Sequence, residues 1–156
     1  MKHWDYIAIG LILWAVWWYV DANGMSSSAS GLGAGFTDAW ANAIASFENV
    51  NPKYNNPGGL NMVGDAGSTP ATGGGVIGIF SSFAAGFTAL VSNLTTDVGR
   101  WGNDSLLQAT ANYVLGPTAA AGYNGNYPAN VVNEANYVAG QLNVSTSETL
   151  NELSGD

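Results

Sequence analysis

The feature that most constrains this chain is an uncharged apolar run near its start, between Asp5 and Asp21. As a helix rising about 1.5 Å per residue, the run would span roughly 22–26 Å, which is short for a bilayer core but workable with local thinning. Aromatic residues gather at both ends, as they do at membrane interfaces: Trp4, Tyr6, Trp17, Trp18 and Tyr19. The run therefore predicts one transmembrane helix within residues 1–21, with residues 4–20 against the lipid bilayer.

Two other interpretations of this run stay open. A cleaved signal peptide has an apolar region of similar length, although no Ala-x-Ala site follows here. A buried core helix would need cover around its whole circumference, which a small domain hardly provides. If the run is an anchor, Lys2 and the amino terminus favour the inner side for its start, so the rest of the chain would lie outside the membrane.

The composition changes after the apolar run. Residues 22–36 are rich in Gly, Ser and Ala, which is typical of a flexible tether. Residues 37–156 are enough for one domain with a single core.

Charge and composition exclude several classes of function. The formal net charge is −8 at pH 7, with three Lys and Arg residues in all, so no nucleic-acid partner is expected. There is no Cys, and the single His, His3, precedes the apolar run. A thiol nucleophile, a Ser-His-Asp triad and a His-based metal centre are therefore not expected, nor is any cofactor. Carboxylate chemistry is what remains for an enzyme.

The best candidate for such chemistry is Glu48. An apolar stripe at helical spacing precedes it, made of Trp40, Ile44 and Phe47, and Pro52 follows closely enough to end the helix. At the negative end of the helix dipole and among apolar neighbours, the Glu48 carboxyl is expected to have a raised pKa. A raised pKa suits a general acid near neutral pH. The alternative is an ordinary surface Glu at a helix end.

The remaining pattern predicts an α+β fold that is mostly α. Residues 61–63 and 76–80 are expected to pair as a small hairpin around a Gly-rich loop. In the helices that follow, Tyr113 is grouped with apolar residues, and Glu134 is expected on an exposed face. The expected helix-start signals are Ser81 or Ser82, Asp104 or Ser105, Pro128, and a Ser145–Glu148 capping box.

Four short motifs follow one another between residues 38 and 153. They are Ile-Ala-Ser-Phe-Glu at 44–48, Asn-Asn-Pro-Gly-Gly-Leu at 55–60, Gly-Gly-Gly-Val-Ile-Gly-Ile-Phe at 73–80, and Ala-Gly-Phe-Thr-Ala-Leu at 85–90. Their order and spacing resemble those of the lysozyme-like domain of phage virion-associated peptidoglycan-cleaving enzymes, in the lytic transglycosylase and lysozyme superfamily. The resemblance implies a lysozyme-like domain with a small β-hairpin lobe. It also implies residue roles: Glu48 as the catalytic acid, and Asn55, Asn56, Gly58, Gly59 and Phe80 in substrate binding.

Two positions depart from the pattern of that family. Asn49 stands where Gly usually follows the catalytic Glu, and Gly59 stands where Asn is usual. If the family's Asn orients the sugar or the acid, the Gly59 departure bears directly on activity.

A second resemblance concerns two tyrosines. Residues 121–125, Ala-Gly-Tyr-Asn-Gly, and residues 136–138, Asn-Tyr-Val, look like elements of soluble lytic transglycosylases in which a tyrosine supports the catalytic acid. By this resemblance Tyr123 and Tyr137 are candidate supporting residues, although Tyr-Asn-Gly is also an ordinary turn. The hairpin lobe would form one wall of the glycan cleft, and Asp65 within it is a candidate second acid.

Together these features predict a membrane-anchored lytic enzyme that cleaves the β-1,4 bond between N-acetylmuramic acid and N-acetylglucosamine in peptidoglycan. Glu48 would act as general acid and then base, as in a lytic transglycosylase. A hydrolase would instead use a second carboxylate, from Asp65, Asp97 or Asp104. The expected partners are the glycan strand, the bilayer and virion proteins.

Two alternatives remain for this function, a host-encoded periplasmic enzyme in place of a phage enzyme and a protein without catalytic activity. The same fold could serve as a non-catalytic membrane-anchored virion structural or peptidoglycan-binding protein. The expected location is the internal membrane of a phage virion, and otherwise the bacterial inner membrane with the domain facing the periplasm.

Overall fold

The computed structural model describes residues 33–48, 52–71 and 75–155. The predicted anchor and all but the end of the predicted tether lie outside these ranges. Within the ranges, no helix is both long and apolar enough to cross a membrane.

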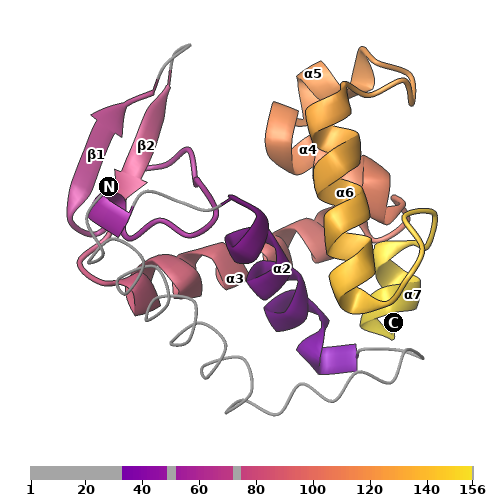
Figure 1. Cartoon of the computed structure of the whole chain (residues 1–156), viewed down its shortest axis with the longest axis horizontal. Helices are drawn as coiled ribbons and strands as arrows, with labels where there is room; N and C mark the ends of the chain where they lie inside the picture. The colour runs from indigo at the N-terminus through magenta and orange to yellow at the C-terminus, as the bar shows by residue number, and fades with distance from the viewer. Residues whose placement is uncertain (1–32, 49–51, 72–74, 156) are drawn as a thin grey trace, which may run out of the picture.

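The described residues form an α+β fold that is mostly helical, as predicted. A two-stranded antiparallel sheet lies on one side of the molecule and helices α4 to α7 on the other, with α2 and α3 passing between them (Figure 1). The elements in chain order are η1 (Gly33–Gly35), α2 (Phe36–Glu48), η2 (Pro52–Tyr54), β1 (Gly67–Pro70), β2 (Val76–Ile79), α3 (Phe83–Trp101), α4 (Leu106–Leu115), α5 (Pro117–Ala121), α6 (Ala129–Leu142) and α7 (Leu150–Ser154).

Helix α2 lies at the centre of the core. Phe36, Trp40 and Ile44 are fully buried, and the rings of Phe36 and Trp40 stack with their centroids 5.5 Å apart. The helix packs against both α3 and α6, so its apolar stripe has partners on two sides. Residues 33–36, the end of the predicted tether, lie in η1 and at the start of α2, and Phe36 is buried.

The hairpin differs from the predicted one. Strand β1 pairs with β2 from Gly67↔Ile79 to Pro70↔Val76, and residues 61–63 belong to neither strand. The reason is a tight turn in which Gly64 and Gly67 exchange backbone hydrogen bonds of 2.9 and 3.0 Å. A side chain at Gly64 would collide with the Ile79 carbonyl, so only glycine lets the chain reverse there.

The predicted start signals of α3 and α4 are confirmed. The Ser82 hydroxyl accepts from Ala85 N at 3.1 Å, and the Ser105 hydroxyl accepts from Gln108 N at 3.2 Å. The predicted Ser145–Glu148 capping box is present in part: Glu148 Oε1 accepts from Ser145 N at 3.1 Å and a short turn follows. The complete capping box of α7 lies one turn later, between Thr149 and Glu152. Pro128 comes just before the first residue of α6 and does not lie within its first turn.

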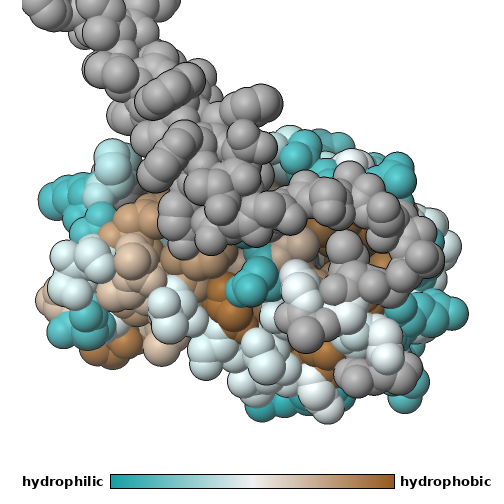
Figure 2. Space-filling model, turned by 90° about the horizontal axis from the view of Figure 1, so that it is seen from below, coloured by the Kyte–Doolittle hydropathy of each residue, from teal (hydrophilic) through white to brown (hydrophobic). Residues whose placement is uncertain are grey.

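The two ends of α3 have different surroundings. Seen from below, hydrophobic surface gathers on the side of the molecule where α3 begins, and Phe83 at that end is half exposed (Figure 2). Further along, Leu90 and Leu94 enter the core. The last turns carry polar and aromatic residues toward the site described next.

Candidate active site

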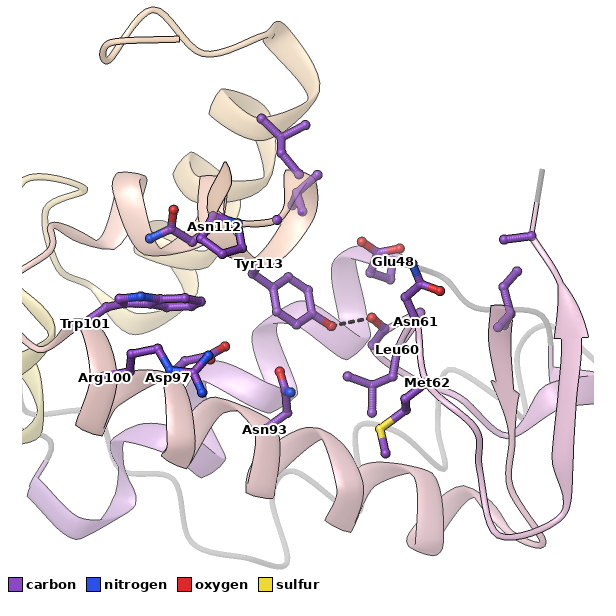
Figure 3. Close-up of a pocket in the computed structure, with 18 residues that line it drawn as sticks. Glu48, Leu60, Asn61, Met62, Asn93, Asp97, Arg100, Trp101, Asn112 and Tyr113 are labelled. Atoms are coloured by element: carbon purple, nitrogen blue, oxygen red, sulfur yellow. Dashed lines mark hydrogen bonds between the residues drawn. The ribbon is translucent and has the colours of Figure 1, made fainter. Parts of the chain in front are cut away.

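A groove of about 700 Å³ runs between the hairpin side and the helical side, and Glu48 lines it (Figure 3). Glu48 is the last residue of α2, so the buried stripe of that helix fixes the position of its backbone. The turn after η2 and the end of α4 supply the two walls, and α3 supplies the floor between them. Besides Glu48, the groove is lined by Gly58, Gly59, Leu60, Asn61, Met62, Ala71, Ile77, Asn93, Asp97, Arg100, Trp101, Asn112, Tyr113, Val114, Leu115, Gly116 and Pro117.

The environment of Glu48 favours its neutral form. The residue as a whole is exposed, since it faces the open groove. Its carboxyl is nevertheless partly removed from water by the groove walls, and this desolvation raises the pKa. The direction agrees with the sequence-based prediction, and the cause is burial.

Asn55 and Asn56 hold the turn in place and do not face the groove. The Asn55 side chain donates to Phe80 O at 3.0 Å. Asn56 is buried; its amide donates to Leu60 O at 3.0 Å and to Gly78 O at 3.2 Å, and accepts from Leu60 N at 2.8 Å. Phe80 is buried in the core. These three predicted substrate-binding residues therefore join the turn to the hairpin.

Gly58 and Gly59 do line the groove. A Cβ at Gly58 would come within 2.6 Å of both Leu90 Cδ1 and Tyr113 Oη, so the close packing there requires glycine. Gly59 has φ +60°, and a Cβ on it would lie 3.6 Å from Glu48 Oε2. A side chain at position 59 would therefore lie beside the candidate acid, and in this chain that space is empty of protein atoms.

Tyr113 is a site residue that the sequence-based reasoning missed. It extends from α4 into the groove, where Figure 3 shows it between Glu48 and Asp97, and its hydroxyl donates to Gly58 O. Burial raises the pKa of its phenol, and the negative charges of Glu48, Glu134 and Asp97 raise it further. The missed signal was a tyrosine in an apolar helical stripe, because a buried phenol needs a polar partner.

The two tyrosines predicted to support the acid lie elsewhere. Tyr123 is exposed in the connection between α5 and α6, with its ring 6.4 Å from that of Tyr127. Tyr137 on α6 is half buried and packs on Phe47, with 5.4 Å between ring centroids. Neither lines the groove, although Tyr137 braces the residue that precedes Glu48.

Asp65 and Asp104 are also outside the groove lining. Asp65 accepts from Ser81 N at 2.8 Å and from the Ser81 hydroxyl at 2.6 Å, and these bonds lower its pKa. Asp104 accepts from the Asn112 amide at 2.9 Å. Each has a structural partner, which argues against a role as second acid.

Two other carboxyl groups belong to this region of the fold. Asp97 is buried on α3 and lines the groove; burial raises its pKa to about 6, and Arg100 partly opposes the shift. Glu134 on α6 is 2 % exposed, so its predicted exposed position is wrong. It lies on the same buried face of the helix as Val131 and Val138. The prediction placed Glu134 on the exposed face because its side chain is charged, although its spacing from these two valines matches the buried face. Burial, and then the charge of Glu48, raise the pKa of Glu134 to about 7.

Comparisons with protein-family models, with curated proteins and with solved structures find no match to this chain. The resemblance to peptidoglycan-cleaving enzymes therefore remains a prediction from the motifs. What the structure adds is the placement of their residues: the Glu48 motif and Gly58 and Gly59 meet at one groove, together with Tyr113.

Proposed function

We propose that this protein is a peptidoglycan lytic enzyme in which Glu48 is the general acid. The observation that carries the proposal is the position of Glu48 in the groove, with its carboxyl partly desolvated and its pKa raised. A general acid benefits from a raised pKa and must face a space that substrate can enter; the direction of the Glu48 shift and its place in the groove support both conditions.

The lining of the groove suits a sugar chain. Its volume lies within the usual range of ligand sites. Asn61, Asn93 and Asn112 offer amide donors and acceptors for hydroxyl and acetamido groups, and the Trp101 ring offers an apolar face. The mixture supports recognition by hydrogen bonds and stacking, as a glycan requires.

In the proposed reaction, Glu48 gives its proton to the glycosidic oxygen as the bond from that oxygen to the muramic acid C1 breaks. The carbonyl oxygen of the sugar's own 2-acetamido group stabilises the positive charge that develops at C1. The Glu48 carboxylate then takes the proton of the sugar's 6-hydroxyl, whose oxygen bonds to C1. The products are a free 4-hydroxyl and a 1,6-anhydro end, and Glu48 is again protonated.

The carboxylates of the groove support this scheme over a two-carboxylate hydrolase. Among the described residues that line the groove, the carboxylates are Glu48 and Asp97. Tyr113 lies between them in Figure 3 and separates the Asp97 carboxylate from the Glu48 carboxyl. A scheme with a single acid and substrate assistance is a recognised exception to the usual pairing of carboxylates.

Gly59 favours a second candidate function, binding of peptidoglycan without cleavage. In the family that the motifs resemble, Asn is usual at this position, and here no side chain occupies the space beside Glu48 Oε2. If that amide is needed to orient the acid, the groove would still hold a glycan strand but would not cut it.

The proposed location depends on residues 1–32, which lie outside the described ranges. An anchor there would hold the domain outside a membrane, in a phage virion or at the bacterial inner membrane. Virion proteins would then be further partners.

Digestion of purified cell walls by the wild type and by Glu48→Gln tests the proposal. We expect the wild type to release anhydro-ended muropeptides and Glu48→Gln to be slower by about 10²–10⁴-fold, because it removes the proton donor and keeps the shape. Reducing ends in place of anhydro ends would indicate a hydrolase. Equal inactivity of the two proteins, with wall binding retained, would favour the binding function.

A further inference from the structure

The end of the groove away from the hairpin carries a positive charge, which is unusual in this acidic protein. The chain has a net charge of −8, and its Lys and Arg residues number three. Of these, Arg100 lines the groove, and it is the only cation among the described residues that do so. A lone cation in a groove of an acidic protein needs a physical explanation.

Arg100 and Trp101 form one unit on the last turn of α3. The guanidinium carbon of Arg100 lies 5.6 Å from the centroid of the Trp101 ring, within the range of a cation–π contact. Both side chains line the groove, and Trp101 is half buried. The contact limits the freedom of the guanidinium, so less conformational entropy is lost when Arg100 binds a ligand.

Two structural explanations for Arg100 fall short. A cation in the last turn of a helix interacts favourably with the helix dipole, but any position in that turn would serve, including those that face bulk water. Arg100 also lies one turn after Asp97 and stabilises its ionised form. Asp97 is buried, however, whereas Arg100 is exposed and lines the groove, so the guanidinium remains accessible to a ligand.

We propose that Arg100 and Trp101 form a subsite for the acidic, peptide-bearing substituent of the muramic acid residue. This inference rests on the proposed function. Muramic acid carries a lactyl group, either as a free carboxylate or extended by a stem peptide that ends in carboxylates, and N-acetylglucosamine carries no such group. The guanidinium pairs with a carboxylate of the substituent, and the indole covers the adjacent apolar surface. Arg100 thus distinguishes peptidoglycan from an uncharged glycan of the same length.

Binding to the full chain carrying Glu48→Gln tests the subsite without turnover. The ligands are a tetrasaccharide of peptidoglycan with its stem peptides, the same tetrasaccharide with the peptides removed by an amidase, and a tetramer of N-acetylglucosamine. Each Kd is measured by calorimetry with Arg100 intact, with Arg100→Gln, and with Lys53→Gln. Lys53 is the control, because it carries the same charge and is not among the residues that line the groove.

We expect Arg100→Gln to weaken binding of the peptide-bearing ligand about tenfold, and to change the Kd of the uncharged tetramer less than about twofold. Lys53→Gln should change both values little and equally. Weakening of the amidase-treated ligand as well would identify the lactyl carboxylate as the group that binds. An equal effect of Arg100→Gln on charged and uncharged ligands, or no effect on either, would overturn the subsite while leaving the proposed function intact. Failure of all three ligands to bind would overturn both.

Discussion

Three carboxyl groups surround one phenol in this site. Glu48, Glu134 and Asp97 come from different helices, and each contributes to the raised pKa of Tyr113. The raised pKa of Glu48 and of Asp97 comes from burial, whereas the charge of Glu48 adds to the raised pKa of Glu134. For Glu48, the desolvated carboxyl keeps its proton to a higher pH than a free one, which suits the proposed proton donor.

Glu134 gives this crowding a measurable effect on stability. Its folded-state pKa of about 7 lies above the ordinary value of 4.5, so the folded protein binds more protons than the unfolded chain between these two pH values. Below about pH 4.5 Glu134 is protonated in both the folded and the unfolded state, so its burial does not lower the free energy of unfolding through ionisation. As the pH rises from about 4.5 toward 7, the free energy of unfolding falls by on the order of 3 kcal/mol, because the unfolded chain ionises Glu134 more readily.

We therefore expect Glu134→Gln to raise the free energy of unfolding at pH 8 by about 2–3 kcal/mol and to change it little at pH 4. Urea unfolding followed by circular dichroism between pH 4 and 8 checks this. Asp38→Asn, which removes one negative charge from an exposed position of α2, controls for the change in net charge. Equal destabilisation by Glu134→Gln at every pH would mean that its carboxyl has a partner which the amide cannot replace.

At the level of elements, the hairpin depends on its first turn more than on its strands. Each strand has four residues, and neither is fully buried along its length. The turn from Gly64 to Gly67 sets the register by placing Ala66 N against Ile79 O at 3.0 Å. Because the Gly64 backbone packs directly on Ile79, we expect this one position to control the whole element.

Gly64→Ala should lower the free energy of unfolding by about 1–3 kcal/mol, since the methyl group must displace the Ile79 backbone. Gly99→Ala in α3 is the matched control, because a Cβ there meets nothing within 4 Å and alanine favours a helix. Thermal unfolding of both variants, with amide hydrogen exchange in the hairpin, checks this. Unchanged exchange in residues 76–79 of Gly64→Ala would contradict it.

Local signals predicted some elements well. The apolar stripe before Glu48 and the capping serines of α3 and α4 are local signals, because each involves residues a few positions apart. The sequence alone was therefore enough to predict these helices. The hairpin register was not predictable in this way, because it depends on a contact between Gly64 and Ile79 that only the folded chain makes.

The candidate site shows the same division. Glu48 was predicted from its own helix and the turn that follows. Tyr113 is held in the site by a hydrogen bond to Gly58, which is 55 residues away in the sequence. Glu134 is brought toward Glu48 by the packing of α6 on α2. In the sequence, both residues have the pattern of ordinary helix positions. Their place at the site depends on which helices pack together, and the local sequence does not show this.

For the whole molecule, the strongly acidic character should control the encounter with the substrate. A protein of net charge −8 and a cell wall that carries carboxylates repel each other at long range, and salt screens that repulsion. The proposed Arg100 subsite would act only at contact and would not cancel this repulsion.

We therefore expect cell-wall digestion by the wild type to become faster as NaCl is raised from about 10 mM to about 150 mM, as the Debye length falls from about 30 Å to about 8 Å. Turbidity loss of purified walls measures the rate. Walls whose carboxyl groups have been amidated serve as the control and should show no such increase. Slower digestion at higher salt would indicate that local attraction dominates.

The bond from Tyr113 to Gly58 joins the helical side of the molecule to the hairpin side at the groove. The aromatic ring is rigid, and its hydrogen bond ties the two walls to each other without any ligand. Such a tie favours a groove that is formed before a ligand enters, so that selection among ligands would depend on fit more than on closure around them.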